Sequence, residues 1–379
     1  MKILCDLISF QSGFSGGGEY TKRICKELCV NGGLDILGLY DSNLYFNPES
    51  QSFISKYNIK LIDISQKPLK LIVEENYVDK IFVGVPSLFF NYDFKDVSCK
   101  IIVTVHDLRN HELLLNNIRG RLVFRFGGFK TKIKQLIARL YPPFTYKWAI
   151  NSIDEKLLKK ENVFITTVSY YSKVSILYYM NLLRKEIPVF YPPLKEITEK
   201  KEIIQNNKLR SVIENKKKYF LLVSGNVPEK NIDVFLNVFK KLSLIDPSLY
   251  CVLTGVELRS ENEKIVSVGY LSTSDLEYAY SNAFIFVYPT YKEGFGYPPL
   301  EAMKYGVPCC ISNVTSLPEV YGDSVVYFSP FYEADVFDKI QYLIENEKIY
   351  RKRSIKHYEM MKERQNSDLK RLIDYILSV

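Results

Sequence analysis

The chain has 379 residues, of which 51 are Lys or Arg and 43 are Asp or Glu, so its formal net charge is +8. An apolar content of 47% excludes an intrinsically disordered chain, and 18 glycines are too few for a collagen-like one. Because a single hydrophobic core stops growing near ~250–300 residues, the length predicts two domains.

The seven cysteines are odd in number and scattered, and no C-x-x-C pair occurs among them. With only three histidines the chain offers few zinc ligands, so we expect reduced thiols. The N-terminal stretch is too short for a signal peptide, and no run approaches the ~18–20 apolar residues of a membrane-spanning helix. We therefore expect a cytoplasmic protein.

The first half of the sequence alternates strand-like and helix-length segments. Met1–Phe10 predicts a buried strand, and Gln11–Gly18 predicts a loop that carries Gly13, Gly16, Gly17 and Gly18. Helical periodicity follows this loop. Four further strands are expected at 34–40, 81–85, 101–105 and 163–168. Strands that alternate with helices predict a parallel, doubly wound α/β sheet.

A polar break separates this series from a second one. Tyr191-Pro192-Pro193 ends a strand, and 195–218 is rich in Lys, Glu and Asn, as an interdomain connection would be. Strands are then predicted at 219–223, 249–253, 265–268, 284–288, 308–312 and 325–328. Helices are predicted at about 231–244, 273–283, 298–305, 333–346 and 348–379. Two such domains predict a cleft between them, with ligands at the carboxyl ends of the strands.

Two glutamates stand eight residues apart in the segment 286–306, FVYPTYKEGFGYPPLEAMKYG. Glu293 lies in a predicted loop after a strand, and Glu301 lies about one turn inside the following helix. Gly294 and Gly296 allow close approach of the backbone, and the helix N-terminus favours an anionic ligand. On spacing alone, a glutamate that caps a glycine-rich turn explains the pattern equally well.

The run E-G-F-G-x-P-x-L-E-A-M-x-x-G-x-P in this segment resembles the signature of the retaining glycosyltransferases with the E-x7-E motif, glycosyltransferase family 4, of GT-B fold. Glu293 and Glu301 occupy its two acidic positions. The similarity extends over about 222–330. It is looser in the first half of the chain, where it includes Gly16-Gly17-Gly18 and Thr104–Leu108.

The resemblance implies two Rossmann-like domains that face a central cleft. Residues 1–195 would form an acceptor-binding domain, and 196–350 would form the domain that binds the nucleotide sugar. Residues 351–379 would form a helical tail that packs back toward the N-terminal domain.

The resemblance also implies roles for the residues of the motif. Glu301 would bind the ribose hydroxyls of the nucleotide sugar, and Glu293 would act at the transferred sugar, near the reacting centre. The backbone around Gly294, Phe295 and Gly296 would hold that sugar and the adjacent phosphate.

A second part of the implied donor site follows the first strand of the second series, in Gly225-Asn226-Val227-Pro228-Glu229-Lys230. By the resemblance, Lys230 matches a phosphate-binding lysine whose ammonium stabilises the departing diphosphate. Gly225 and Asn226 would belong to the same site. Many relatives carry Arg beside that glycine, so Asn226 leaves the second cation for the diphosphate unidentified. A surface lysine without this role is the plain alternative for Lys230.

The first half contributes three candidate residues. Gly16 and Gly17 precede a predicted helix, where the backbone could approach a phosphate or a sugar, or could form an ordinary tight turn. His106 follows the strand at 100–105 and is paired with Asp107. By the resemblance, His106 would contact the transferred sugar during catalysis, and a purely structural histidine is the alternative.

The implied reaction is retaining, with attack on the face that the leaving group departs from, so it needs no enzyme nucleophile. No Asp-x-Asp occurs in the chain, and the metal ligands of the other large glycosyltransferase fold are therefore absent. We expect an enzyme that uses no metal or other cofactor and takes a GDP-, UDP- or dTDP-sugar. The expected acceptor is a lipid-linked glycan of bacterial cell-surface polysaccharide synthesis.

The excess charge is concentrated in one stretch. Residues 113–153 hold eight cations and no Asp or Glu, with seven aromatic side chains between them. Basic amphipathic segments bind anionic membranes, at about 1 kcal/mol per Lys or Arg. We expect this stretch to contact the inner face of the plasma membrane, although a solvated basic helix is a close alternative. No nucleic-acid-binding motif occurs.

Two other functions compete with sugar transfer. A strand, a glycine-rich loop, a helix and a strand that ends at Asp41 imitate a dinucleotide-binding fold, so an NAD-dependent oxidoreductase is one alternative. The G-x-G-x-x-G fingerprint is incomplete, and this alternative leaves the Glu293–Glu301 segment unexplained. A non-catalytic subunit that only binds a nucleotide sugar is the other alternative.

Overall fold

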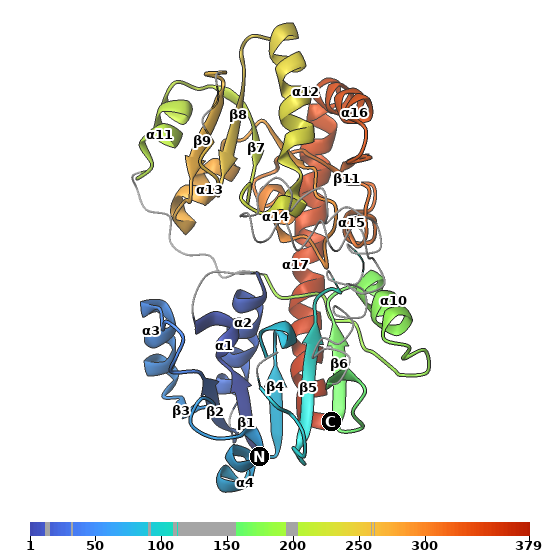
Figure 1. The fold of residues 1–379 in the computed structure, drawn as a ribbon. Helices are drawn as coiled ribbons and strands as arrows, with labels where there is room; N and C mark the ends of the chain where they lie inside the picture. The colour runs from blue at the N-terminus through green and yellow to red at the C-terminus, as the bar shows by residue number, and fades with distance from the viewer. Residues whose placement is uncertain are drawn as a thin grey trace, which may run out of the picture. The chain divides into compact units, whose positions relative to one another are not determined.

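The computed structural model describes residues 1–11, 16–31, 33–89, 92–108, 112, 157–194, 204–258, 260 and 262–379. These residues form two compact units (Figure 1). Unit 1 consists of the described residues up to 194 together with Arg364–Val379, and unit 2 consists of those from 204 to Glu363. Each unit contains one six-stranded sheet. The predicted basic stretch at 113–153 lies outside the described residues.

The sheet of unit 1 is parallel, with strand order β3-β2-β1-β4-β5-β6. Its strands are β1 (Lys2–Asp6), β2 (Asp35–Tyr40), β3 (Lys60–Asp63), β4 (Lys80–Val83), β5 (Lys100–Val105) and β6 (Val163–Thr167). Its helices are α1 (Ile8–Gln11), α2 (Gly16–Val30), α3 (Pro48–Tyr57), α4 (Leu69–Asn76), the 3-10 turn η1 (Pro86–Phe89) and α10 (Tyr170–Tyr179). The order reverses between β1 and β4, as in a dinucleotide-binding domain.

The structure corrects several predictions in this unit, and the predicted strand at 81–85 becomes β4, which ends at Val83. The predicted strand at Met1–Phe10 ends at Asp6, because Ile8–Gln11 forms the single turn α1. Within the predicted loop Gln11–Gly18, Gly16–Gly18 are the first residues of helix α2. Strand β3 was not predicted, because it is a short edge strand whose four residues are exposed or half-buried.

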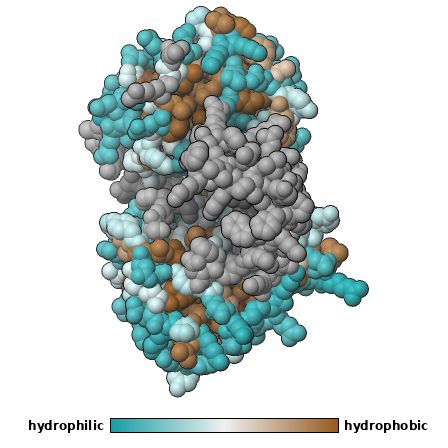
Figure 2. Space-filling view, in the orientation of Figure 1, coloured by the Kyte–Doolittle hydropathy of each residue, from teal (hydrophilic) through white to brown (hydrophobic). Residues whose placement is uncertain are grey.

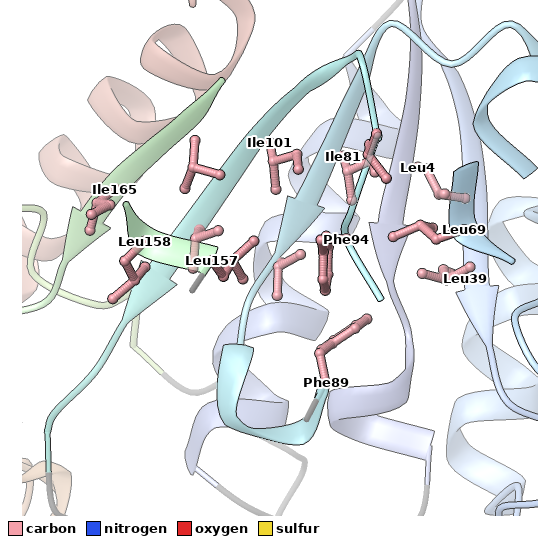
Figure 3. Close-up of a cluster of buried hydrophobic side chains, with 14 of the residues drawn as sticks. Leu4, Leu39, Leu69, Ile81, Phe89, Phe94, Ile101, Leu157, Leu158 and Ile165 are labelled. Carbon is pink, nitrogen blue, oxygen red and sulfur yellow. The ribbon is translucent and has the colours of Figure 1, made fainter. Parts of the chain in front are cut away.

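The strands of unit 1 are continuous apolar segments in the sequence because their side chains form its hydrophobic core. Figure 3 shows Leu4, Ile81 and Ile101 projecting from β1, β4 and β5. The rings of Phe89 and Phe94 pack across the same face of the sheet. Parallel sheets bury both faces under helices, and this burial supplies most of the driving force for folding.

Unit 2 repeats this topology. Its strands are β7 (Lys218–Leu222), β8 (Leu249–Thr254), β9 (Ile265–Gly269), β10 (Ile285–Tyr288), β11 (Cys309–Ser312) and β12 (Val326–Phe328). Their order is β12-β11-β10-β7-β8-β9, again with the first strand of the unit beside the fourth. All six strands were predicted, each end to within one residue.

The helices of unit 2 lie on both faces of its sheet. They are α11 (Asn207–Glu214), the 3-10 turn η2 (Pro228–Lys230), α12 (Ile232–Ile245), α13 (Thr273–Ser281), α14 (Tyr297–Met303), α15 (Leu317–Tyr321), α16 (Glu333–Glu345) and α17 (Glu347–Ser378). Helices α12 and α16 pack against each other and share one core with Phe220, Leu222 and Leu253 (Figure 1). Side chains at the strand positions between these core residues point to the opposite face of the sheet, where α13 lies. Tyr219 donates to Ala279 O over 2.6 Å, and the rings of Phe286 and Tyr280 lie 5.7 Å apart.

The last helix, α17, contributes to both units. Residues up to Glu363 belong to unit 2, and Arg364–Ser378 belong to unit 1. In unit 1, Asp368 accepts a hydrogen bond from the backbone N–H of Tyr191 over 2.9 Å, and Gln365 donates to Pro192 O over 2.5 Å. Helix α17 thereby anchors the Pro-rich segment that begins the predicted interdomain connection.

The surface of both units is mostly polar on the face that Figure 2 shows, with apolar residues in smaller patches. In the described part of the chain, no helix is long and apolar enough to cross a membrane.

Candidate active site

The topology of unit 2 determines where a ligand site can form. In an open parallel sheet, ligands bind beyond the carboxyl ends of the strands, at the point where the strand order reverses. In unit 2 this switch point lies between β7 and β10. Lys230 follows β7 at the end of the turn η2, and Glu293 follows β10. The fold therefore brings these two residues to the same place, although 63 positions separate them.

Lys230 and Glu293 form an ion pair at this switch point. The Nζ atom of Lys230 lies 2.6 Å from Oε1 of Glu293, and the two side chains are 15% and 12% exposed. The hydroxyl of Tyr288, the last residue of β10, contacts both, at 2.5 Å from Nζ and 2.7 Å from Oε1. Thr290 donates to the same carboxylate oxygen over 3.0 Å. The site thus holds a cation and an anion in fixed positions, with part of each side chain open to solvent.

Burial keeps the hydroxyl of Tyr288 protonated. The pKa of Tyr288 is raised well above 10, first by burial and then by the adjacent Glu293 carboxylate. Tyr288 therefore donates its hydrogen bond to Glu293 at every physiological pH, and its oxygen accepts one from Lys230.

Three loops hold the backbone around the ion pair. The N–H of Tyr291 donates to Glu229 O over 2.8 Å, which ties the loop after β10 to η2. From the loop after β11, Thr315 accepts from the N–H of Glu293 over 3.0 Å, and Ser316 donates to Glu293 O over 3.0 Å. These bonds fix the position of Glu293 before any ligand arrives.

Gly296 is required by the turn that leads into α14. Its φ is +88°, and a Cβ atom there would lie 2.6 Å from Cδ2 of Leu317. The buried hydroxyl of Tyr321 donates to Gly296 O and accepts from the N–H of Leu300 over 3.1 Å. Phe295 is buried, with its ring 5.5 Å from that of Tyr297. The turn therefore has no side chain at Gly296, and the hydrogen bonds of Tyr321 hold its backbone in place.

Glu301, the second acidic residue of the motif, projects from α14. Its Oε2 atom accepts a hydrogen bond from the hydroxyl of Tyr280 on α13 over 2.7 Å. The pKa of Tyr280 is raised well above 10, first by burial and then by the charge of Glu301. The half-buried carboxylate is therefore held on the α13–α14 side of the site.

The loop after β7 places Gly225 and Asn226 beside the end of β8. The N–H of Gly225 donates to Thr254 O over 2.9 Å, and a Cβ atom at Gly225 would lie 2.6 Å from Val256. Asn226 is exposed and donates to the hydroxyl of Tyr270 over 2.5 Å. Position 226 therefore supplies an amide, and not a cation, to the edge of the site.

His106 lies at the carboxyl end of β5 in unit 1. Its Nε2 atom lies 3.0 Å from Gly84 O, and its ring stands edge-on to Tyr20, with centroids 4.8 Å apart. Because a carbonyl can only accept, the Nε2 atom carries the proton. Burial lowers the pKa of His106, so the imidazole is neutral at pH 7.

The two candidate glycines of unit 1 differ in their surroundings. A Cβ atom at Gly17 would lie 2.7 Å from Cγ2 of Val85, whereas Gly16 has no atom within 4 Å of that position. Gly17 thus allows α2 to approach the turn after β4. At this switch point the carboxylate of Asp6 accepts the backbone N–H groups of Gly84 and Val85, over 3.2 and 3.4 Å.

Asp41, which imitated the ribose-binding acid of a dinucleotide fold, is buried in local contacts. Its carboxylate accepts hydrogen bonds from the hydroxyl of Tyr92 and, over 2.8 Å, from the N–H of Asn43. The N–H of Asp41 donates to Gln11 over 3.1 Å. These contacts give the oxidoreductase alternative no support.

The structure thus brings together some of the predicted residues and leaves others separate. Lys230 and Glu293 are in contact, and Gly225, Asn226, Gly294–Gly296 and Glu301 lie in the same unit. His106, Gly16 and Gly17 lie in unit 1, so their approach to the donor residues stays a prediction. Within the described ranges, no group of three or more His, Cys, Asp or Glu is placed to hold a metal ion.

Sequence reasoning assigned no role to six residues that hold this site, namely Tyr280, Tyr288, Thr290, Thr315, Ser316 and Tyr321. Each forms a hydrogen bond to Glu293, Glu301 or the Gly296 turn. Tyrosines at apolar strand and helix positions read as core residues, and only Tyr288 stands at a strand end where a polar contact could have been predicted.

Most of unit 2 is similar in sequence to known proteins. Residues 204–365 match the family described as "Glycosyl transferases group 1". The chain is 39% identical to O-antigen chain mannosyltransferase B of Escherichia coli over 125 residues, which are 30% of this chain and 33% of that protein. It is 28% identical to O-antigen chain mannosyltransferase RfbU of Salmonella typhimurium over 247 residues, 61% of each chain. The match thus spans about a third of the length of the Escherichia coli protein and about three fifths of the length of the Salmonella protein.

A solved structure covers the whole chain. Anabaena HepE in complex with UDP-glucose aligns over 100% of both chains, with a TM-score of 0.64 at 14% identity. The likeness shows the GT-B fold and confirms the predicted class of two doubly wound α/β domains. Together with the family match, the relatives support a glycosyltransferase.

Proposed function

We propose that this chain is a retaining glycosyltransferase that moves a sugar from a nucleotide-sugar donor to a glycan, in the synthesis of a bacterial cell-surface polysaccharide. The observation that carries the proposal is the ion pair of Lys230 and Glu293 at the switch point of unit 2. An enzyme for this reaction has to hold a diphosphate beside the sugar that it activates. A fixed ammonium and a fixed carboxylate in contact supply both requirements.

In the proposed reaction, the bond from the sugar C1 to the diphosphate breaks while the acceptor oxygen attacks from the same face. The negative charge that grows on the leaving diphosphate is stabilised by Lys230, which moves from Glu293 toward the phosphate oxygens. The departing phosphate oxygen takes the proton of the acceptor hydroxyl. Glu293 holds a hydroxyl of the transferred sugar, and its negative charge favours the oxocarbenium-like transition state.

Glu301 binds the ribose hydroxyls in this proposal. A ribose diol would donate to this carboxylate alongside the bond that its Oε2 atom accepts from Tyr280. The neutral His106 of unit 1 acts at the transferred sugar as a hydrogen-bonding group. The reaction uses no metal ion, because Lys230 and backbone N–H groups supply the positive charge.

The relatives support a narrower choice of substrates. Both O-antigen proteins are named as mannosyltransferases, and the HepE structure contains UDP-glucose. We therefore propose a hexose donated from GDP or UDP, and a growing glycan on a lipid carrier as the acceptor. The chain would work at the cytoplasmic face of the membrane that holds this carrier.

The test is hydrolysis of the donor, which needs no knowledge of the acceptor. We expect the wild-type chain to release nucleotide from one of UDP-, GDP-, ADP- and dTDP-sugars in the presence of EDTA, and Glu293→Gln to abolish this release. Glu229→Gln is a matched control, because that carboxylate neighbours Lys230 but only its backbone carbonyl holds the site.

Each outcome decides between the alternatives. Nucleotide release that survives in Glu293→Gln would overturn the site. Tight binding of a nucleotide sugar without release by the wild type would favour the non-catalytic subunit. Stabilisation by NAD but by no nucleotide sugar would return the oxidoreductase alternative.

A further inference from the structure

Two aromatic rings, those of Tyr291 and Phe331, are in contact near the loops that carry Lys230 and Glu293, and Tyr332 follows Phe331 in the chain; none of the three has a part in the proposed reaction. Tyr291 follows β10, and Phe331 and Tyr332 follow β12, so all three lie at the carboxyl edge of the unit 2 sheet. The rings of Tyr291 and Phe331 are stacked, with centroids 5.5 Å apart and planes inclined by 28°. We call these three residues the aromatic surface.

The aromatic surface is open to solvent. Phe331 is 55% exposed and Tyr332 is 68% exposed, while Tyr291 is half-buried. A single exposed apolar residue needs no explanation, but Tyr291 and Phe331 come from two separate loops and their rings are in contact, so they form a small aromatic patch. Exposed patches of this kind mark places where a ligand or a partner binds.

Backbone hydrogen bonds hold this surface in place relative to the ion pair. The N–H of Tyr291 donates to Glu229 O, next to Lys230. The buried side-chain amide of Asn231 donates to Pro330 O over 3.0 Å, which ties the turn of Phe331 to the residue that follows Lys230. The surface is therefore fixed before a ligand binds, and little conformational entropy is lost on binding.

Glu301 lies on a helix at one face of the unit 2 sheet, and Phe331 and Tyr332 directly precede a helix at the other face. Glu301 is held by Tyr280 on the α13–α14 side of the sheet. Phe331 and Tyr332 directly precede α16, which packs against α12 on the other side. In the proposed function, the nucleoside extends from Lys230 toward Glu301. The aromatic surface is thus left for the other substrate.

We propose that Tyr291, Phe331 and Tyr332 form a saccharide subsite of unit 2, which binds the acceptor glycan next to the reacting centre and adds to the acceptor-binding residues expected in unit 1. The inference rests on the proposed function and extends it. One face of a hexose ring presents C–H groups, which pack on the electron-rich face of an aromatic ring. The hydroxyls at the rim of the sugar remain free to contact water and the phenolic groups of Tyr291 and Tyr332.

The size of the surface favours a sugar over a second protein. A stable protein interface buries about 800 Å² on each partner, with some 20–30 residues a side. Three side chains are too few for such an interface, but the outer face of a stacked aromatic pair matches the footprint of one sugar ring. Tyr291 is also only two residues from Glu293 in the chain, which favours a substrate of the reaction over an unrelated protein as the ligand.

The experiment measures saccharide binding and donor hydrolysis on the same samples of the full chain. The probes are α-mannobiose, maltose, chitobiose and galactobiose, titrated with detection by saturation-transfer NMR. We expect at least one to bind wild type with a Kd of roughly 1–10 mM, and Phe331→Ala to weaken it about tenfold or more. Phe331→Trp, which keeps an aromatic face, should bind like wild type. Donor hydrolysis should be equal in all three.

Tyr342→Ala is the matched control. Tyr342 is also an exposed tyrosine, 47% accessible, but it lies at the far end of α16, where no saccharide should touch it. Retained saccharide binding by Phe331→Ala, or binding of none of the four probes, would overturn the subsite. A loss of self-association in Phe331→Ala, seen by sedimentation, would also overturn it and assign the surface to a second copy of the chain. Failure of the wild type to hydrolyse any donor would instead count against the proposed function.

Discussion

The two units share one strand order but differ at the point where that order reverses. In unit 1, the switch point between β1 and β4 is closed by the buried carboxylate of Asp6, which takes the backbone N–H groups of Gly84 and Val85. In unit 2, the switch point between β7 and β10 holds Lys230 and Glu293, which are partly exposed and bonded to each other. One topology therefore gives a sealed position in one unit and a displaceable ion pair in the other.

The two switch points differ in the groups that the acidic side chain binds: backbone N–H groups in unit 1 and other side chains in unit 2. Unit 1 satisfies the N–H groups after β4 with its own side chain, so an anionic ligand there would have to displace Asp6. Unit 2 satisfies its carboxylate with the side chains of Tyr288, Thr290 and Lys230. A phosphate can take the lysine from this set without leaving a buried group unpaired.

The largest expected effect tests the open switch point of unit 2. We expect Lys230→Met to slow sugar transfer by about 10²–10³, because the diphosphate loses a fixed charge that acts mainly in the transition state. Initial rates at saturating donor measure the loss. Lys240→Met, which removes an exposed lysine from α12, should leave the rate unchanged. Equal rates for both variants would mean that the unit 2 ion pair is structural, like Asp6 in unit 1.

The next effect tests the closed switch point of unit 1. Burial raises the pKa of Asp6 from 3.8 to about 6, so the folded chain binds this proton more tightly than the unfolded chain. The contribution of Asp6 to the free energy of unfolding therefore falls as the pH rises from about 4 to about 6, by roughly 3 kcal/mol. Urea unfolding of wild type and Asp6→Asn across this range measures it.

We expect Asp6→Asn to lose most of this pH dependence, while its donor hydrolysis at pH 7 stays close to that of the wild type. The same slope of stability against pH in both proteins would show that Asp6 is not the group responsible. A loss of hydrolysis in a folded Asp6→Asn variant would bring the unit 1 switch point into the reaction.

A smaller effect concerns the backbone that supports Glu293. Gly296→Ala should cost about 1–2 kcal/mol and reduce transfer, because Ala disfavours a φ of +88° and its Cβ would collide with Leu317. Thermal unfolding and initial rates measure the two losses. Gly33→Ala is the control, since Gly33 in unit 1 has the same φ of +88° with no atom within 4 Å. Transfer by Gly33→Ala should be normal, and a normal rate in Gly296→Ala would contradict the prediction.

The smallest effect separates the two glycines of α2. Gly17→Ala should destabilise the chain by about 1 kcal/mol, because its methyl group would press on Val85 at the closed switch point. Gly16→Ala should be neutral or slightly stabilising, since the position is open and Ala favours a helix. Thermal unfolding of the two variants side by side measures the difference. Equal stabilities would show that α2 is not packed as tightly on unit 1 as we describe.

The sequence was most informative where periodicity and a spaced motif coincided. The strands of unit 2 were predicted because each is a short apolar run between turn residues, and Lys230 and Glu293 were predicted from the resemblance. Their contact follows from the fold, because adjacent parallel strands present their following loops at one edge.

Other features depend on contacts that no local pattern reveals. The edge strand β3 was missed because its residues are exposed or half-buried and so lack an apolar run. The role of Asp6 in closing its switch point was missed because its partners are backbone groups 78 and 79 positions away. The locking of the Gly296 turn by Tyr321 was missed for the same reason, since this contact spans 25 positions.

Helix α17 has a consequence for the order in which the chain can fold. Unit 1 contains strands that are translated before those of unit 2, yet it also contains Arg364–Val379, which are translated after the whole of unit 2. The ammonium of Lys80 on β4 is buried against the carbonyls of Ile376 and Leu377, 2.9 and 2.7 Å away. Until those residues emerge, this charge has to stay hydrated and the unit incomplete. Unit 1 therefore begins before unit 2 and is completed after it, and a single cut near residue 195 would separate it from residues that it contains.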